Sequence, residues 1–296
     1  MNRLLSVFAA LALAVAGCSF ALAQSQNSSQ KDGAAKQGKQ GKGGQQDGQG
    51  GTSQAEAEAQ AQAFQEIQSE LDPDKQIQLV NDFEKKYPDS KGLPFAYLVA
   101  ADAYRQKGEV ERVVEYGEKS IKLKDDNPVA LLLVASVLPE PQSLRGNDLD
   151  KEKKLSEAEE YANRAIKLID QIPKAANLTD EQFQKSKSQL ASWAHSSLGM
   201  VHLQRSTMGL TGSDPEELVK AEKEYQAAVT MTDRPNPGDF FRMAEAFRSE
   251  GKTDEAIEAF SKASQLDQGG GIKALADKAI EELKKKKTPE KPPAKP

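Results

Sequence analysis

Apolar residues recur at intervals of three and four from Ala55 to about Lys287, and no stretch in this range alternates with a period of two. A spacing of three and four places apolar side chains along one face of an α-helix. The sequence therefore predicts an all-α chain over this range, without a β-strand.

Two apolar stripes on either side of a turn recur in four segments. In residues 237–270 the first stripe contains Met243 and Ala244, and the second, after Gly251, contains Ala256 and Phe260. Each segment predicts a pair of antiparallel helices whose small residues let the second helix pack across the first. The other segments are 94–127, 128–172 with an insert at 139–151, and 192–236 with an insert at 206–214. The small positions of the four first helices are Ala101, Ala135, Gly199 and Ala244.

This pattern resembles the tetratricopeptide repeat (TPR), a helix–turn–helix unit of 34 residues. Its order of large, apolar, small and aromatic residues, followed by Ala–x3–aromatic–x2–Ala, is met fully by 237–270 and well by 94–127. The resemblance covers residues 94–270. It implies a tetratricopeptide-like α-solenoid, in which each helix pair is stabilised mainly by its neighbours.

The ends of the repeat region predict two further helical elements. Residues 55–93 form a degenerate N-terminal helical hairpin, with one helix up to Leu71 and another from Pro73 to Tyr87. Residues 271–287 form a capping helix, followed by a Pro/Lys tail at 288–296. The residues of the capping helix expected to face inward are Leu275, Ala276, Ala279 and Leu283.

The first 23 residues have the composition of a signal peptide: a basic start, the apolar run LLSVFAALALAVAG, and ALA before Gln24. A second interpretation of this stretch is a bacterial lipobox, VAGC, which ends at Cys18, the only cysteine. Both predict export, to the periplasm, the outer membrane or the medium. Only a lipid anchor or the signal peptide would then contact a membrane. The Gln/Gly-rich residues 24–54 have too few apolar side chains for a core, which predicts a disordered linker.

Charge is distributed unevenly along the chain. The formal net charge is −5, but residues 55–283 contain 29 basic and 42 acidic residues, a net charge of −13. Nucleic-acid binding requires concentrated Lys and Arg. An acidic body therefore argues against nucleic acid as the main partner.

One octet resembles a phosphate-binding loop: AFRSEGKT, residues 246–253. Such a loop follows a strand and opens a helix. Here its first residues continue a predicted helix, so Gly251 is expected to end that helix in a left-handed conformation. Thr253 is expected to cap the next helix. The sequence therefore predicts a turn between helices rather than a nucleotide site.

Two histidines, His195 and His202, lie seven residues apart on one predicted helix face. A metal site is conceivable on this spacing, but zinc would need further ligands. Both histidines occupy positions where the other repeats have Tyr or Phe, so they are predicted to be large packing residues. No metal or cofactor is predicted.

The TPR resemblance implies a non-catalytic protein that binds a protein or peptide segment in a concave groove lined by the first helices of the pairs. Trp193 has two interpretations: an anchor in this groove, because Trp and Arg are frequent at binding hot spots, or a packing residue against the preceding helix. The residues one step off the buried stripes are predicted to face the groove: Phe95, Leu98, Asp102, Arg105, Leu132, Ser136, Trp193, Ser196, Met200, Phe241, Glu245 and Arg248.

On the sequence alone, we expect a scaffold or adaptor of the bacterial cell envelope. Two alternatives stay open. One is an outer-membrane lipoprotein anchored at Cys18, with a structural role in envelope assembly. The other is a nucleotide- or metal-dependent enzyme that uses the octet or the histidines.

Overall fold

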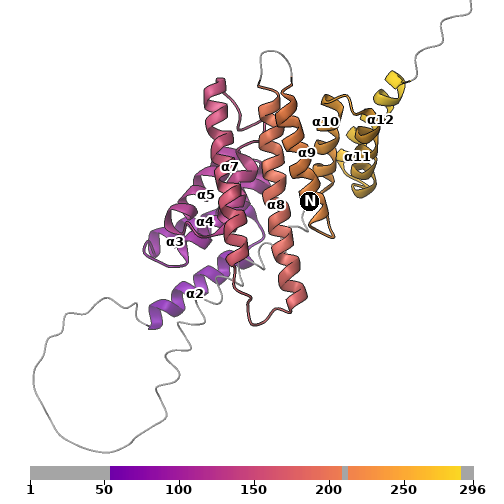
Figure 1. Cartoon of the computed structure of the whole chain (residues 1–296). Coiled ribbons are helices and arrows are strands. Elements are labelled where there is room, and N and C mark those ends of the chain that lie inside the picture. Colours follow the sequence, from indigo (N-terminus) through magenta and orange to yellow (C-terminus); the bar gives the residue numbers. More distant parts are fainter. Residues whose placement is uncertain (1–53, 209–212, 288–296) are drawn as a thin grey trace, which may run out of the picture. The chain divides into compact units, whose positions relative to one another are not determined.

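The computed structural model describes residues 54–208 and 213–287. These residues contain eleven α-helices and no strand (Figure 1), which confirms the prediction of an all-α fold. None of the described helices combines the length and apolar character that crossing a membrane requires. The predicted signal peptide with Cys18, residues 24–53 of the predicted linker, residues 209–212 and the predicted tail lie outside the described residues.

The chain divides into two compact units. The N-terminal unit comprises Met1–Lys124 together with Ala175–Asn177, and the C-terminal unit comprises Asp125–Lys174 and Leu178–Pro296. The N-terminal unit contains the predicted hairpin of 55–93 and the first repeat. The C-terminal unit contains the other three repeats and the capping helix.

Four helices build the described part of the N-terminal unit: α2 (Gln54–Ser69), α3 (Pro73–Lys86), α4 (Leu93–Lys107) and α5 (Val110–Leu123). Each packs against the next along the chain. Asp72 begins α3 by accepting hydrogen bonds from two backbone amides of its first turn, and Gly108, at φ 74°, ends α4. The rings of Tyr97 and Tyr104 pack against Tyr116 between α4 and α5, with centroids 5.9 and 5.1 Å away.

Seven helices build the C-terminal unit: α6 (Pro128–Val137), α7 (Asp148–Gln171), α8 (Asp180–Ser206), α9 (Pro215–Thr230), α10 (Pro237–Ser249), α11 (Thr253–Leu266) and α12 (Gly271–Lys287). The pairs α6–α7, α8–α9 and α10–α11 lie in the segments 128–172, 192–236 and 237–270, where repeats were predicted. Helix α8 begins at Asp180, well before residue 192, because Thr179 and Gln182 form a capping box there. The helix extends beyond the repeat pattern at its N-terminal end.

The small positions predicted for close helix packing are confirmed. Ala101, Ala135 and Ala244 are completely buried, and Gly199 is buried as well. A Cβ atom placed on Gly199 would lie 2.9 Å from two ring carbons of Tyr225 on α9. The absence of a side chain at this position therefore lets α8 and α9 approach each other.

Helix α12 packs against α11, and the position of Leu275 on it was wrongly predicted. Ala276, Ala279 and Leu283 are buried, whereas Leu275 is 56% exposed. Ile272 packs against the core cluster that contains the buried residues of α12. It lies one helical turn before Ala276 and shares its face, whereas Leu275 lies one residue, or about 100°, off that face.

The octet 246–253 forms the turn between α10 and α11. Gly251 has a left-handed conformation with φ 77°, as predicted. The predicted capping role of Thr253 was wrong, because Lys252 is the N-cap residue and Thr253 is already the first residue of α11. The Thr253 hydroxyl donates to the carbonyl of Gly251 at 3.4 Å instead.

Candidate partner-binding surface

In the N-terminal unit, the predicted surface residues lie on α4. Phe95, Asp102 and Arg105 are half-buried, whereas Leu98 is buried and does not present a surface in this conformation. The guanidinium of Arg105 donates to Asp102 at 2.9 Å. The part of α4 left accessible therefore combines one aromatic ring with a paired acid and base.

In the C-terminal unit, α6 contributes little accessible surface. Leu132 is completely buried, so its predicted place on an open surface was wrong. The reason is the composition of α6: it is apolar on nearly all sides, and such a helix is buried around its circumference. Ser136 is half-buried, and its hydroxyl donates to the backbone carbonyl of Leu133 at 2.9 Å.

A buried polar contact joins α8 to α10. The hydroxyl of Ser196 donates to the Oδ1 atom of Asp239 at 2.6 Å, and Asp239 is only 2% exposed. Burial raises the pKa of Asp239 from 3.8 to about 6, although the Ser196 hydrogen bond and the charge of Arg242 oppose the shift. The sequence analysis missed Asp239, since an acidic residue in the first turn of a helix is ordinarily exposed.

A sulfur atom, a phenol and an ion pair lie next to this contact. Met200 is buried, and its Sδ atom accepts weak hydrogen bonds from the Tyr225 hydroxyl at 3.8 Å and from Gln204 at 3.7 Å. Arg242 on α10 and Glu140, just after α6, form an ion pair at 3.4 Å. Burial raises the pKa of the Tyr225 phenol far above its usual range, and the charges of Arg242 and Glu140 also act on it. Met200 was predicted to line an open groove; here it is covered.

The remaining predicted residues of the C-terminal unit lie on α8 and α10. Trp193 is half-buried, and the ring of Phe241 packs edge-on against Phe260 at 5.1 Å. Glu245 and Arg248 form an ion pair, and burial raises the pKa of Glu245. Aromatic and charged groups thus remain accessible along this part of α10.

The two histidines each pair with a glutamate of α9. The Nδ1 atom of His195 lies 2.6 Å from Glu224, and that of His202 lies 2.7 Å from Glu217. Burial disfavours the ionised form of Glu217, but hydrogen bonds from Lys220 and His202 outweigh this effect and lower its pKa. Within residues 54–208 and 213–287, no group of three or more His, Cys, Asp or Glu side chains is placed to hold a metal ion. Both histidines therefore contribute to the α8–α9 contact.

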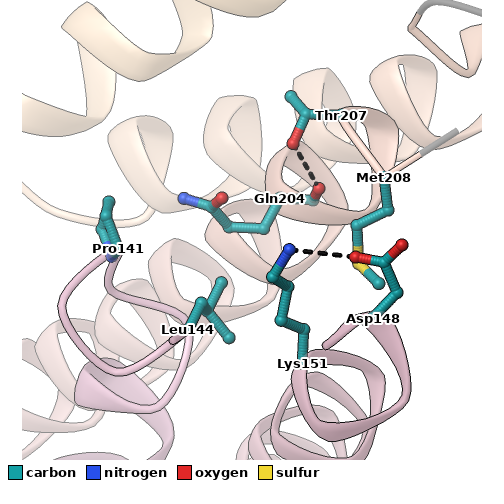
Figure 2. A pocket seen from close by; sticks show the side chains of 7 residues that line it. All are labelled: Pro141, Leu144, Asp148, Lys151, Gln204, Thr207 and Met208. Carbon is teal, nitrogen blue, oxygen red and sulfur yellow. Dashed lines mark hydrogen bonds and ion pairs between the residues drawn. The ribbon is translucent and has the colours of Figure 1, made fainter. Parts of the chain in front are cut away.

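An open pocket of about 380 Å³ lies between α7, α8 and the segment that follows α6 (Figure 2). Its polar groups are engaged with one another: Lys151 with Asp148 at 2.9 Å, and the Thr207 hydroxyl with the carbonyl of Gln204 at 2.8 Å. The lining residues are Pro141, Leu144, Asp148, Lys151, Gln204, Thr207 and Met208.

Comparison with known proteins supports the fold. No family model matches the sequence. No curated protein matches it either. Among solved structures, a thermophilic TPR protein from Thermus thermophilus, TTC0263, is 16% identical with a TM-score of 0.50, and the match covers 75% of this chain and 96% of that one. The assembly chaperone of RpL4, Acl4, is 15% identical with a TM-score of 0.49, over 81% of this chain and 79% of that one. The match to the Thermus protein shows that the antiparallel helix pairs form a TPR-like fold.

Proposed function

We propose that this chain is a non-catalytic protein-interaction scaffold that binds an extended segment or a helix of a partner protein. The TPR-like arrangement of helix pairs is the observation that supports this proposal most directly. Such repeats present an extended surface along the first helices of successive pairs. Specificity then resides in the side chains that those helices leave accessible.

The accessible side chains define the kind of segment that fits. The N-terminal unit offers the Phe95 ring and the Asp102–Arg105 pair on α4, and the C-terminal unit offers Trp193 on α8 and Phe241 on α10. Aromatic side chains provide apolar contact area, and half-buried ion pairs give direction and register. We therefore propose that the partner segment carries apolar anchor residues between charges of both signs.

The cell envelope is the proposed location, on the basis of the predicted export signal in residues 1–23 alone. The two interpretations of that signal differ at Cys18, which a lipobox would lipidate. Incorporation of radiolabelled lipid into the wild type, and its loss in Cys18→Ser, would support an anchored lipoprotein. A mature protein that begins at Gln24 would contradict the anchor and favour a soluble envelope adaptor.

Site-specific photo-crosslinking in envelope extract tests the binding proposal. We place a photoreactive amino acid at Glu245, beside the accessible groups of α10, and compare Trp193→Ala and Arg248→Ala with the matched control Glu258→Ala. Glu258 is an exposed residue of α11, a second helix of its pair. One discrete crosslinked partner, weakened by the first two substitutions but not by the control, is the expected result. A crosslink that none of the three substitutions changes would contradict the proposed surface.

A further inference from the structure

The turns inside the repeats 94–127 and 237–270 contain the same three residue types in opposite order. The first has Lys-Gly-Glu at 107–109, and the second has Glu-Gly-Lys at 250–252. Both glycines have a left-handed conformation, with φ 74° and 77°. The two turns therefore end their first helices in the same way, with the positive and negative side chains exchanged around the glycine.

Lys252 contacts two carboxylates at once. Its Nζ atom donates to Oε2 of Glu222 on α9 at 2.7 Å and lies 3.1 Å from Oε2 of Glu250, the residue that caps the end of α10. The ammonium also lies 5.5 Å from the centroid of the Phe247 ring. The hydrogen bond with Glu222 raises the pKa of Lys252, so the ammonium stays charged. We call Lys252, Glu222 and Glu250 the turn clamp.

Lys107 makes the same kinds of contact in the N-terminal unit. Its Nζ atom lies 2.6 Å from Oδ1 of Asp74 on α3 and 2.9 Å from Oε1 of Glu109. The Tyr104 ring, four residues before the glycine as Phe247 is, has its centroid 5.9 Å from the ammonium. In each unit, one lysine thus joins a carboxylate of the preceding helix to a carboxylate of its own turn. The contact does not depend on the order of Lys and Glu.

The turn clamp is the more buried of the two arrangements. The Glu250 side chain is 11% exposed, against 42% for Glu109. Within the described residues, Oε2 of Glu250 is buried without a hydrogen bond, so the ion pair with Lys252 balances its charge. Without the lysine, this carboxylate would lie beside that of Glu222 with no counter-charge, which is unfavourable for a buried group.

The turn clamp connects two helix pairs. Glu222 belongs to the α8–α9 pair, whereas Glu250 and Lys252 belong to the α10–α11 pair, and α10 packs against both α9 and α11 (Figure 1). The Ser196–Asp239 hydrogen bond joins the same two pairs at the first turn of α10. Apolar contacts have no preferred direction. Two polar contacts at opposite ends of α10 therefore fix its direction, whereas one would let the helix pivot.

We propose that Lys252 is a positioning residue of the partner-binding surface: by holding Glu222 and Glu250 together, it fixes the direction of α10 relative to α8. The spacing between the accessible Trp193 on α8 and Phe241 on α10 follows from this direction. The inference rests on the proposed function. It also gives the octet a role, because the lysine that resembles a phosphate ligand binds carboxylates of its own chain.

The distance between α9 and α11 tests this role without a partner. In the full chain carrying Cys18→Ser, nitroxide labels are attached to cysteines introduced at Gln226 on α9 and Gln265 on α11, two exposed positions. Pulsed electron paramagnetic resonance gives the distribution of distances between the labels. The parent is compared with Lys252→Gln and with the matched control Lys278→Gln, which removes an exposed positive charge on α12.

We expect Lys252→Gln to broaden the distribution. The ratio of the parent distance to other distances should fall by roughly two- to fivefold, the factor by which a partly exposed ion pair biases an equilibrium. Lys252→Arg should preserve the distribution, because a guanidinium can contact both carboxylates. Lys278→Gln should also preserve it. An unchanged distribution in Lys252→Gln, or equal broadening in the control, would overturn the positioning role.

A double variant separates positioning from stability. Lys252→Gln with Glu250→Gln leaves no buried carboxylate at position 250, so the free energy of unfolding should return toward that of the parent. The link to Glu222 stays broken, so the distance distribution should remain broad. A distribution that narrows as stability recovers would overturn the positioning role.

The photo-crosslinking assay connects the turn clamp to the partner. The double variant should weaken the crosslink at Glu245 although its stability is close to that of the parent. An undiminished crosslink would contradict the positioning role and leave the proposed function intact. Failure of the wild type to give a discrete crosslinked partner would overturn the proposed function instead, because the distance measurement contains no partner.

Discussion

The contact between Gly199 on α8 and Tyr225 on α9 gives a sharp prediction for Gly199→Ala. A Cβ atom at this position would lie 2.9 Å from Cδ1 and Cε1 of the tyrosine ring and 3.0 Å from Cγ. Real Cβ atoms do not approach ring carbons this closely. The ring is completely buried in a cluster with Ala221, Ala244 and Phe260, so it has little room to move.

Two opposing effects set the magnitude. Replacing a mid-helix glycine by alanine contributes up to about 1 kcal/mol through helix propensity. Overpacking a core by a methyl group costs about 1–3 kcal/mol. Because the added Cβ atom would lie within 3.0 Å of three ring carbons at once, we expect the steric cost to be larger than the gain in helix propensity. The net loss in the free energy of unfolding should be about 1–2 kcal/mol.

Urea unfolding followed by circular dichroism measures this loss as a lower midpoint with an unchanged slope. The control is Gln184→Ala, on the exposed part of α8, which should stay within about 0.5 kcal/mol of the wild type. Tyr225→Leu removes the ring, so Gly199→Ala in that background should be neutral or stabilising. If Gly199→Ala is as stable as the wild type, or equally destabilising with and without the ring, the steric argument is wrong.

Three further predictions concern the C-terminal unit. Asp239→Asn removes a buried carboxylate whose pKa is raised from 3.8 to about 6. The neutral carboxyl group contributes stability that is fully present below the unfolded pKa of 3.8 and is lost as the pH rises through 6. The variant should therefore gain about 2 kcal/mol relative to the wild type between pH 4 and pH 7.5, measured by unfolding at both values; a pH-independent difference would contradict this. Ala244→Trp should destabilise the fold by about 1–3 kcal/mol or more through overpacking at a completely buried site, and an unchanged melting transition would count against the pairing of α10 and α11. Leu283→Ala should lower the free energy of unfolding by about 2 kcal/mol or more, because Leu283 is buried. Leu275→Ala, on the exposed side of α12, should lower it by less than about 0.5 kcal/mol. Equal decreases in melting temperature for the two variants would contradict this assignment of the buried face of α12.

The site itself was only partly predictable. Phe241, Glu245 and Arg248 lie half-buried or exposed along α10, at positions where the repeat pattern predicts a binding surface. Leu132 and Met200 have the same register but are buried. The position of a residue in the repeat pattern predicts which side of its own helix it lies on. The pattern does not predict which other segment covers that side.

The repeated pattern of large and small residues determined the helix pairs by itself. Helical faces are set by residues three and four positions apart, so Gly199, Ala244 and Phe260 could be assigned to the interior without coordinates. Gly251 could likewise be assigned to a left-handed turn from its place after a stripe. The early start of α8 was also visible in principle, in the capping box at Thr179 and Gln182.

Only the tertiary structure decided the contacts between residues far apart in the sequence. The Ser196–Asp239 bond joins two helices, and the Glu140–Arg242 pair joins residues 102 positions apart. Neither leaves a periodic signal, because each depends on how one helix pair stacks on the next and on where a connecting segment runs. Local spacing therefore specified the helices and their inward faces, whereas stacking specified which outward faces stayed open.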